Sequence, residues 1–161
     1  MQKITPFLWF EDNAEEAMNF YASVFKEAKA GNVVRFGGAP GQPGKVLTAS
    51  LELFGQKFTL LNGGSKFGFT EAVSFVVNCE SQDEVDYYWE KLTADGGKES
   101  KCGWLKDKFG LSWQIIPAAL PKLLGDKEAA RSQRVMQAML QMRKIDVPAL
   151  QRAYDGDEVA V

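Results

Sequence analysis

The chain has 161 residues, of which 45% are hydrophobic and 25% charged, and its formal net charge is −2. This composition is typical of globular proteins, and the weakly acidic balance provides no electrostatic footprint for nucleic acid or an anionic membrane. The sequence contains no histidine, which excludes Ser-His-Asp and Cys-His catalysis and histidine-based metal sites.

The first half of the chain predicts one strand, one helix and three further strands. Apolar residues recur at helical spacing from Ala14 to Phe25, and Asn13 with Glu16 predicts a variant of the capping box. Residues 45–54 alternate between apolar and polar side chains, as in a half-buried strand. The expected elements are strand 4–10, a helix from residue 14, strand 32–36, a Gly/Pro-rich hairpin loop at 37–44, and strands 45–54 and 57–62.

The same order of elements recurs in the second half. Residues 72–79 predict a strand, and the helix 81–95 opens with the capping box of Ser81 and Glu84. Short strands are expected at about 98–101, 103–107 and 111–117. The two copies are offset by about 68 residues, and such a repeat is a stronger signal than either copy alone. A ferredoxin-like βαββαβ domain with an added hairpin is the competing fold, but it has four core strands where about eight are predicted here.

The residues after Pro117 predict a helical tail. Leu120 to Leu124 forms a short apolar turn, residues 127–143 predict a helix, and residues 148–154 predict a last short one. The longer helix has an apolar, methionine-rich stripe that needs a surface to cover it. The tail is expected to pack on its own domain or, alternatively, on a second subunit. The stripe consists of Val135, Met136, Met139, Leu140 and Met142.

The sequence predicts a cytoplasmic protein. The longest apolar stretches, such as residues 115–120, are far shorter than the roughly 20 residues that span a bilayer. The N-terminus, MQKITPFLWF, lacks the apolar core and cleavage site of a signal peptide. Cys79 and Cys102 form no CxxC motif, so both thiols are expected to be reduced.

Two segments resemble a known family. ITPFLWFEDNAEEAMNFYASVF and CGWLKDKFGLSWQIIP are similar to the PhnB-like branch, often labelled 3-demethylubiquinone-9 3-methyltransferase, of the glyoxalase/bleomycin-resistance/extradiol-dioxygenase superfamily. The tail RVMQAMLQMRKIDVPALQRAY resembles the C-terminal extension of a longer subgroup. The resemblance implies an α+β fold of the vicinal-oxygen-chelate type, in which two βαβββ modules form a curled mixed sheet. We expect a paired domain at 1–119, with modules at about 1–66 and 70–119, and a C-terminal helical extension at 120–161.

In that superfamily the concave face of each module lines a cavity, and strand alternation predicts which side chains face it. Positions covered by a helix are expected to be Leu47, Ala49, Leu51 and Leu53 in the first module, and Val73, Phe75, Val77, Trp113 and Ile115 in the second. Ser112 is expected on the cavity side. The candidate ligand-binding residues on that side are Thr5, Phe7, Trp9, Ser50, Glu52, Ser74, Trp104 and Gln114.

The resemblance also raises the question of a metal. Superfamily enzymes such as glyoxalase I hold a divalent cation with side chains on the first, third, fifth and last strands, which correspond here to positions near Thr5, Glu52, Ala72 and Gln114. Of these, Glu52 alone is an anionic ligand. A Zn²⁺, Ni²⁺ or Fe²⁺ site normally needs three or four His, Cys or carboxylate ligands. We therefore expect neither a metal nor a cofactor.

Three classes of function remain. Metal-free binding of an unknown small molecule is favoured over a metal-independent enzyme that uses Glu52 as acid or base. The third class is an interaction domain that uses the methionine-rich tail. Glu52 is alternatively a surface carboxylate paired with a lysine or arginine, Trp9 and Trp104 are alternatively packing residues, and Asp107 alternatively stabilises a turn.

Two further expectations concern partners and chemistry. A Rossmann-type methyltransferase is rejected, because the glycine-rich segment 37–44 joins two strands and not a strand and a helix. The superfamily resemblance and the methionine-rich tail together predict a homodimer.

Overall fold

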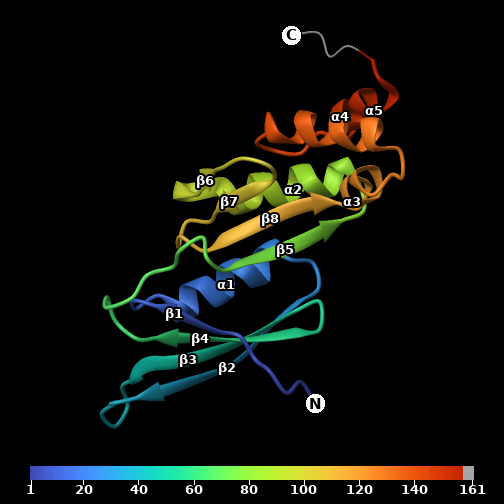
Figure 1. Ribbon diagram of the computed structural model, residues 1–161. Helices are drawn as coiled ribbons and strands as arrows, with labels where there is room; N and C mark the ends of the chain where they lie inside the picture. Colours follow the sequence, from blue (N-terminus) through green and yellow to red (C-terminus); the bar gives the residue numbers. More distant parts are fainter. Residues whose placement is uncertain (158–161) are drawn as a thin grey trace. The chain divides into compact units, whose positions relative to one another are not determined.

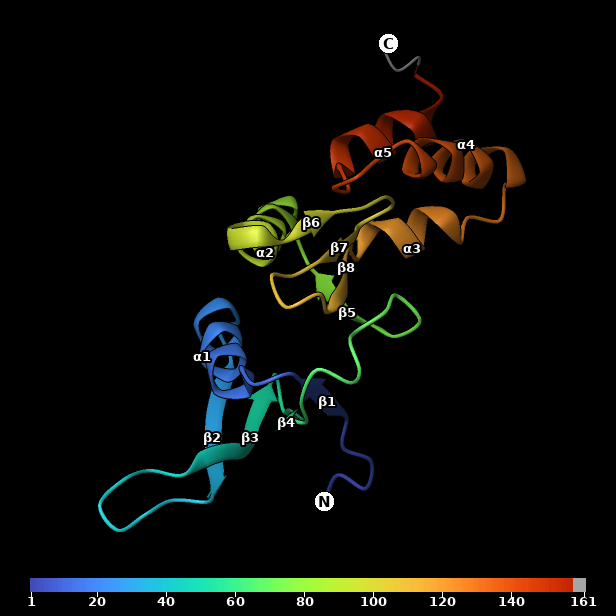
Figure 2. The ribbon, with the colours of Figure 1, turned by 90° about the vertical axis from the view of Figure 1, so that its left-hand side faces the viewer.

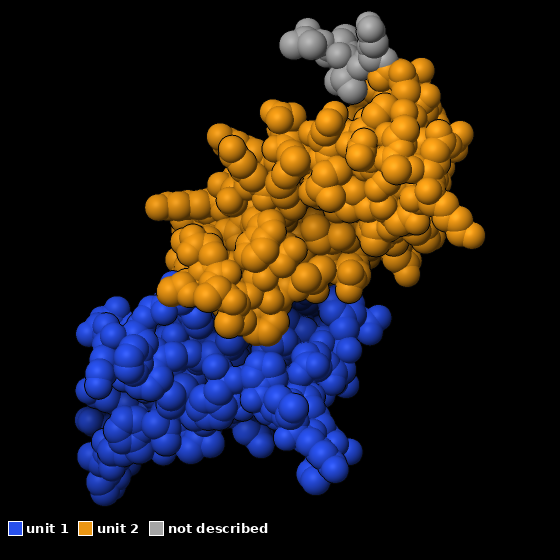
Figure 3. All heavy atoms as spheres, viewed as in Figure 1, with its two compact units in different colours: residues 1–69 blue, residues 70–161 orange. Residues whose placement is uncertain are grey.

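The computed structural model describes residues 1–157 and divides the chain into two compact units (Figure 3). Unit 1 comprises residues 1–69, and unit 2 begins at residue 70. The last four residues of the predicted extension, 158–161, lie outside the described residues. Between residues 1 and 157, no helix combines the length and the apolar composition that crossing a membrane requires.

Unit 1 is a four-stranded mixed sheet with a helix packed on one face (Figures 1 and 2). The last strand lies between the first and the third, so that the strand order is β1-β4-β3-β2. β4 runs parallel to β1 and antiparallel to β3. The predicted order of one strand, one helix and three strands is confirmed. The elements are β1 (Phe7–Phe10), α1 (Ala14–Val24), β2 (Ala28–Phe36), β3 (Lys45–Leu53) and β4 (Gln56–Asn62).

Strand alternation builds the core of unit 1. Ala49, Leu51 and Leu53 are buried, as predicted, on the face of β3 that α1 covers. The prediction is wrong for Leu47, which is 38% exposed, because it lies opposite a register irregularity between Val34 and Arg35 of β2. β1 begins at Phe7 and not at residue 4, and β2 begins four residues earlier than predicted, at Ala28.

The start of α1 differs from the prediction. Asn13 occupies the N-cap position, but its side chain makes no capping hydrogen bond. Asn62, at the end of β4, accepts a hydrogen bond from the Ala14 backbone N–H at 2.8 Å instead, and donates one to the Val46 carbonyl at 3.1 Å. The free amide of the first helical turn is therefore satisfied by a residue 48 positions away in the sequence.

Unit 2 repeats this topology with different lengths. Its sheet order is β5-β8-β7-β6, with β8 parallel to β5 and antiparallel to β7. Ser81 accepts from the Glu84 N–H, which confirms the predicted cap. Val73 was expected beneath α2 but is 63% exposed, because β5 begins after it, at Ser74. The elements are β5 (Ser74–Cys79), α2 (Gln82–Thr93), a 3-10 turn (Ala94–Gly96), β6 (Lys98–Glu99), β7 (Trp104–Lys106) and β8 (Ser112–Pro117).

The tail forms three helices that pack together within unit 2 (Figure 2). They are α3 (Ala119–Leu124), α4 (Ala129–Leu140) and α5 (Val147–Asp155), which are shorter or longer by a few residues than predicted. Their buried core consists of Leu120, Val135, Ile145 and Leu150, with Ile116 of β8 packed against it. The tail therefore covers part of its stripe with its own unit, whereas Met136 and Leu140 remain exposed.

Hydrogen bonds fix the tail to the rest of unit 2. The backbone N–H groups of Cys102 and Gly103 donate to the carbonyls of Met142 and Arg143, both at 2.8 Å. The Gln82 amide, at the start of α2, donates to the Ile145 carbonyl and accepts from the Val147 N–H. Because one side chain bridges two backbone groups of the α4–α5 connection, that connection has a defined position on α2.

Candidate functional site

In each unit, the sheet face opposite α1 or α2 carries a mixture of polar and aromatic side chains, and we call these the open faces. The open face of unit 1 includes four of the predicted site residues, Phe7, Trp9, Ser50 and Glu52, together with Thr48, Thr59 and Leu61. The open face of unit 2 includes the other three, Ser74, Trp104 and Gln114, together with Val76, Lys106 and Ser112. Thr5 precedes β1 and is exposed, so it is not part of the sheet.

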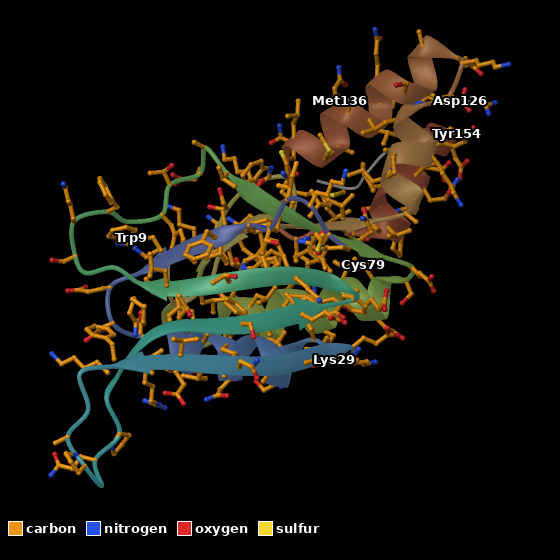
Figure 4. The ribbon with its side chains drawn as sticks, turned by 90° about the horizontal axis from the view of Figure 1, so that it is seen from below. Trp9, Lys29, Cys79, Asp126, Met136 and Tyr154 are labelled. Carbon is orange, nitrogen blue, oxygen red and sulfur yellow. The ribbon has the colours of Figure 1, made fainter. Side chains whose placement is uncertain are left out.

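Trp9 is held in one orientation on unit 1 (Figure 4). Its indole N–H donates to the Gly64 carbonyl at 2.8 Å, and its ring meets Phe67 edge to face at a centroid distance of 5.1 Å. Gly63 lies so close that a Cβ atom there would be 2.2 Å from the Trp9 ring. The ring is half-buried. Trp9 is therefore packed in place and half-buried, and its role as a platform for a ligand stays a prediction.

Glu52 is engaged by a neighbouring strand. Its Oε1 lies 3.1 Å from Nζ of Lys29, which lies opposite it on β2, and its side chain is 24% exposed (Figure 4 labels Lys29). This is the pairing that the alternative interpretation of Glu52 describes. Ser50 donates to the Asn32 carbonyl at 3.3 Å, next to the register irregularity of β2. Ser50 and Glu52 thus both have partners on β2.

On the open face of unit 2, Gln114 joins two strands. Its amide donates to the Ser74 hydroxyl at 2.9 Å, across the parallel pair β5–β8. On its other side it lies opposite Trp104 of β7, which is half-buried. Asn78 and Ile116 continue this face toward the tail. The structure therefore brings Ser74, Gln114 and Trp104 together on one sheet.

A hollow of about 200 Å³ lies beside Trp104 at the β6–β7 end of this sheet. Four of its residues, Glu71, Lys98, Glu99 and Lys106, are charged groups that the sequence did not single out. Lys106 could have been found, since it is two residues from Trp104 on the same strand and therefore shares its face. The lining residues are Glu71, Lys98, Glu99, Ser100, Trp104, Leu105, Lys106 and Ser112.

Glu71 forms an ion pair with Lys106 above this part of the sheet. The Lys106 ammonium group donates to the Glu71 carboxylate and so lowers the pKa of that carboxyl below its ordinary value. Glu71 itself is exposed, so solvent screens the pair and its contribution to stability is small.

Asp107 is the most buried carboxylate in the described chain, and its contacts agree with the turn-stabilising interpretation. One oxygen accepts from the backbone N–H groups of Phe109 and Leu111, at 2.9 and 3.1 Å. The other accepts from the Trp113 indole N–H at 2.9 Å. These bonds fix the turn between β7 and β8 and place Trp113 on the helix-covered face.

A second hollow, of about 760 Å³, lies in unit 1 at the start of α1. It is lined by four carboxylates, Glu11, Asp12, Glu15 and Glu16, and by Lys45. Arg35 pairs with Glu15 through both carboxylate oxygens, at 2.9 and 3.0 Å. This hollow shares none of its lining with the predicted site residues.

The donor groups do not fit the metal that the superfamily resemblance implies. Of the four implied positions, Thr5 lies outside the strand, Ala72 has no ligand atom, and Gln114 has its amide on Ser74. Glu52 is the single carboxylate, and it is paired with Lys29. Among residues 1–157, no three His, Cys, Asp or Glu side chains lie together as a metal site requires.

A family model described as 3-demethylubiquinone-9 3-methyltransferase matches residues 2–116. A solved structure of a putative 3-demethylubiquinone-9 3-methyltransferase, PhnB protein, from Bacillus cereus is 39% identical, covers 73% of this chain and 100% of its own, and has a TM-score of 0.65. The chain belongs to this PhnB-like family. The helices α3 to α5 lie beyond the residues that the family model matches.

Two more distant structures share the fold. Protein PA1353 from Pseudomonas aeruginosa is 20% identical over 73% of this chain and 98% of its own, with a TM-score of 0.60. The fosfomycin resistance protein FosX from Listeria monocytogenes is 16% identical over 76% of this chain and 97% of its own, with a TM-score of 0.51. The predicted vicinal-oxygen-chelate fold of two βαβββ modules is thus confirmed. No match is found among curated proteins.

Proposed function

We propose that this PhnB-like protein binds a small molecule on the open faces of its sheets without a metal ion. The observation that carries the proposal is the fixed, partly exposed ring of Trp9. A tryptophan that is held by a hydrogen bond and a neighbouring ring loses little side-chain entropy when a ligand stacks on it. The polar groups of Ser50 and Thr59 in the adjacent row supply hydrogen-bonding partners.

Metal-independent binding is supported by the donor set. FosX, in a further structure, is complexed with Mn(II) and sulfate ion. In the present chain, the four positions that the superfamily resemblance implies for a metal hold one carboxylate, Glu52, which forms an ion pair with Lys29. A metal at Glu52 would therefore need to displace an ammonium group and would gain a single anionic ligand.

Binding is favoured over catalysis by the contacts of Glu52. Glu52, the candidate base, forms the ion pair with Lys29 that a structural surface carboxylate would form, and no recognisable catalytic dyad includes it among the described residues. The methyltransferase in the family description is not proposed for this chain. The glycine-rich segment of this chain, 37–44, connects the antiparallel strands β2 and β3. In a nucleotide-binding turn, such a segment would instead lead from a strand into the N-terminus of a helix.

The expected homodimer and cytoplasmic location are also proposals. Met136 and Leu140 lie one turn apart on α4 and are exposed, which supports association through this helix. Static light scattering at micromolar concentration tests the dimer, and a monomeric mass would contradict it. The two free cysteines support a reducing compartment.

A thermal-shift screen of small metabolites tests the function, because a ligand that binds the folded state raises the melting temperature by mass action. For a hit, Trp9→Ala is expected to abolish the shift and Trp9→Phe to retain part of it. Glu90→Gln, an exposed carboxylate on α2, is the matched control for Glu52→Gln. A hit whose shift survives both Trp9→Ala and Glu52→Gln would contradict binding on the open face of unit 1. Elemental analysis that finds one transition metal per chain would contradict the metal-free mode.

A further inference from the structure

Four polar side chains form a row across the open face of unit 2. The strand register places Ser74 of β5 opposite Ser112 of β8, Ser112 opposite Lys106 of β7, and Lys106 opposite Lys98 of β6. Side chains at opposite positions of neighbouring strands lie on the same face. We call Ser74, Ser112, Lys106 and Lys98 the polar row.

The hydroxyl of Ser112 has no partner. Ser112 is 1% exposed, and its Oγ makes no hydrogen bond to any described residue. Buried polar atoms are nearly always hydrogen-bonded, because an unpaired one loses its hydrogen bonds to water without replacing them. Ser112 also lines the hollow beside Trp104. A hydroxyl without a partner at the edge of a hollow can hydrogen-bond to a ligand atom that enters the hollow.

The row also has an excess of positive charge. Lys98 and Lys106 lie directly opposite each other on antiparallel strands, an arrangement that is unfavourable without counter-charges. Glu71 supplies one carboxylate to Lys106, while Lys98 makes no ion pair within residues 1–157. Glu99, the other acid at the hollow, accepts from the Trp89 indole N–H and lies 3.7 Å from Arg143.

We propose that the polar row is a subsite for the anionic group of a small molecule, a carboxylate or a phosphate, held by Lys106, Lys98 and the Ser112 hydroxyl beside the ring of Trp104. Without the ligand, the Glu71 carboxylate forms the ion pair with Lys106, and the anionic group of the ligand displaces it. The inference rests on the proposed function, since it names the chemical class of ligand for the open face of unit 2.

Titration of the full chain with three sodium salts tests this inference, followed by the backbone and indole N–H signals in two-dimensional NMR. Phosphate, acetate and benzoate are compared with chloride at the same ionic strength. Saturable shifts at the Trp104 indole and the Ser112 amide are expected. If phosphate binds more tightly than acetate, the ligand group is a phosphate. If benzoate binds more tightly than both, the ligand is a carboxylate whose own aromatic ring stacks on Trp104.

Three variants distinguish the subsite from general electrostatics. Lys106→Gln is expected to weaken binding roughly tenfold, because a charge-assisted hydrogen bond is lost. Ser112→Ala is expected to weaken it roughly fivefold without lowering the melting temperature, because the hydroxyl has no partner to lose. Glu71→Gln is expected to tighten it several-fold by removing the competing carboxylate. Lys91→Gln and Glu90→Gln make the same charge changes at exposed positions of α2, which covers the other face of the sheet, and are expected to change the affinity by less than about twofold.

Several results would overturn the inference. These are no saturable shift with any of the three anions, equal effects of Glu71→Gln and Glu90→Gln, or a lower melting temperature for Ser112→Ala, which would mean that the hydroxyl has a structural role. Metabolite hits that are uncharged and insensitive to Lys106→Gln would refute the anion subsite and leave the binding function standing. Anion binding at the row with no metabolite hit in the thermal-shift screen would refute the broader function alone.

Discussion

The two units have the same strand order but stabilise it by different means. In unit 1 the polar residue that joins helix and sheet is Asn62, a neutral amide at the end of β4. In unit 2 the helix is capped by its own Ser81, and the polar residue that organises the sheet is the buried Asp107. Ser50 and Glu52 on β3 have protein partners, whereas unit 2 leaves the Ser112 hydroxyl unpaired. The repeated topology therefore places a face of mixed polar and aromatic side chains in each unit, but the partners of the polar groups on the two faces differ.

Asp107→Ala is expected to lower the free energy of unfolding more than the other variants, because the Asp107 carboxylate fixes the turn between β7 and β8 in unit 2. It removes the acceptor of three donors, two of them backbone N–H groups in the β7–β8 turn, and we expect a loss of about 4 kcal/mol in the free energy of unfolding. Urea unfolding measures it, and Asp107→Asn, which keeps one carbonyl acceptor, is the control with a smaller loss. A loss below about 1 kcal/mol would contradict this role.

Gly63→Ala tests how rigidly unit 1 holds Trp9. The added Cβ would lie 2.2 Å from the Trp9 ring, so the ring must move, and overpacking of this kind costs about 2 kcal/mol. We expect that loss of stability together with a changed tryptophan emission spectrum. Gly68→Ala is the matched control, because a Cβ there meets no atom within 4 Å. Similar behaviour of the two variants would show that the ring is not fixed.

Asn62→Ala and Ser81→Ala compare the two ways of capping a helix. Ser81 satisfies one backbone N–H, and its loss is expected to cost about 1 kcal/mol. Asn62 makes two hydrogen bonds, to α1 and to β3, and we expect about 1.5–2 kcal/mol. Chemical denaturation of both variants measures the difference. A cost for Ser81→Ala as large as that for Asn62→Ala would remove the distinction.

The smallest expected effect is a difference in alkylation rate between the two cysteines, both of which lie in unit 2. Burial raises the pKa of the Cys79 thiol to about 12, with a smaller contribution from Glu84. The thiolate is the reactive form, so at pH 8 Cys79 is expected to be alkylated by iodoacetamide far more slowly than the partly exposed Cys102. Mass spectrometry of timed samples measures the two rates. In urea the two rates are expected to converge, and a difference that persisted there would contradict burial as the cause.

The sequence predicts most of the fold, because two kinds of signal repeat in it. The alternation of residues 45–54 and the helical spacing from Ala14 report local structure, and they recur about 68 residues later. The predictions are wrong where a residue far away in the sequence determines the local structure. Asn62 replaces the local cap at Asn13, and the early part of β2 is a strand because it pairs with β3, although its own sequence does not alternate.

For the candidate site, the sequence predicts which side of a strand a residue faces but not what it contacts. Ser112 and Gln114 have the same predicted orientation, yet Gln114 finds Ser74 and Ser112 finds no partner. Glu71 lies in an irregular segment before β5, where no periodicity exists to predict its contact with Lys106. These differences depend on atoms brought together by pairing of β5, β7 and β8, which no short window of sequence contains.

The position of the last strand of each module has a consequence for synthesis on the ribosome. β4 lies between β1 and β3, so the sheet of unit 1 is incomplete until residue 62 has left the exit tunnel. Unit 1 then contains every strand that it needs, while most of unit 2 is still untranslated. At about 5–20 residues per second, the remaining chain takes several seconds to appear, which is longer than most small domains need to fold. In unit 2 the same arrangement delays closure until β8, so the tail helices emerge just as the surface that receives them is completed.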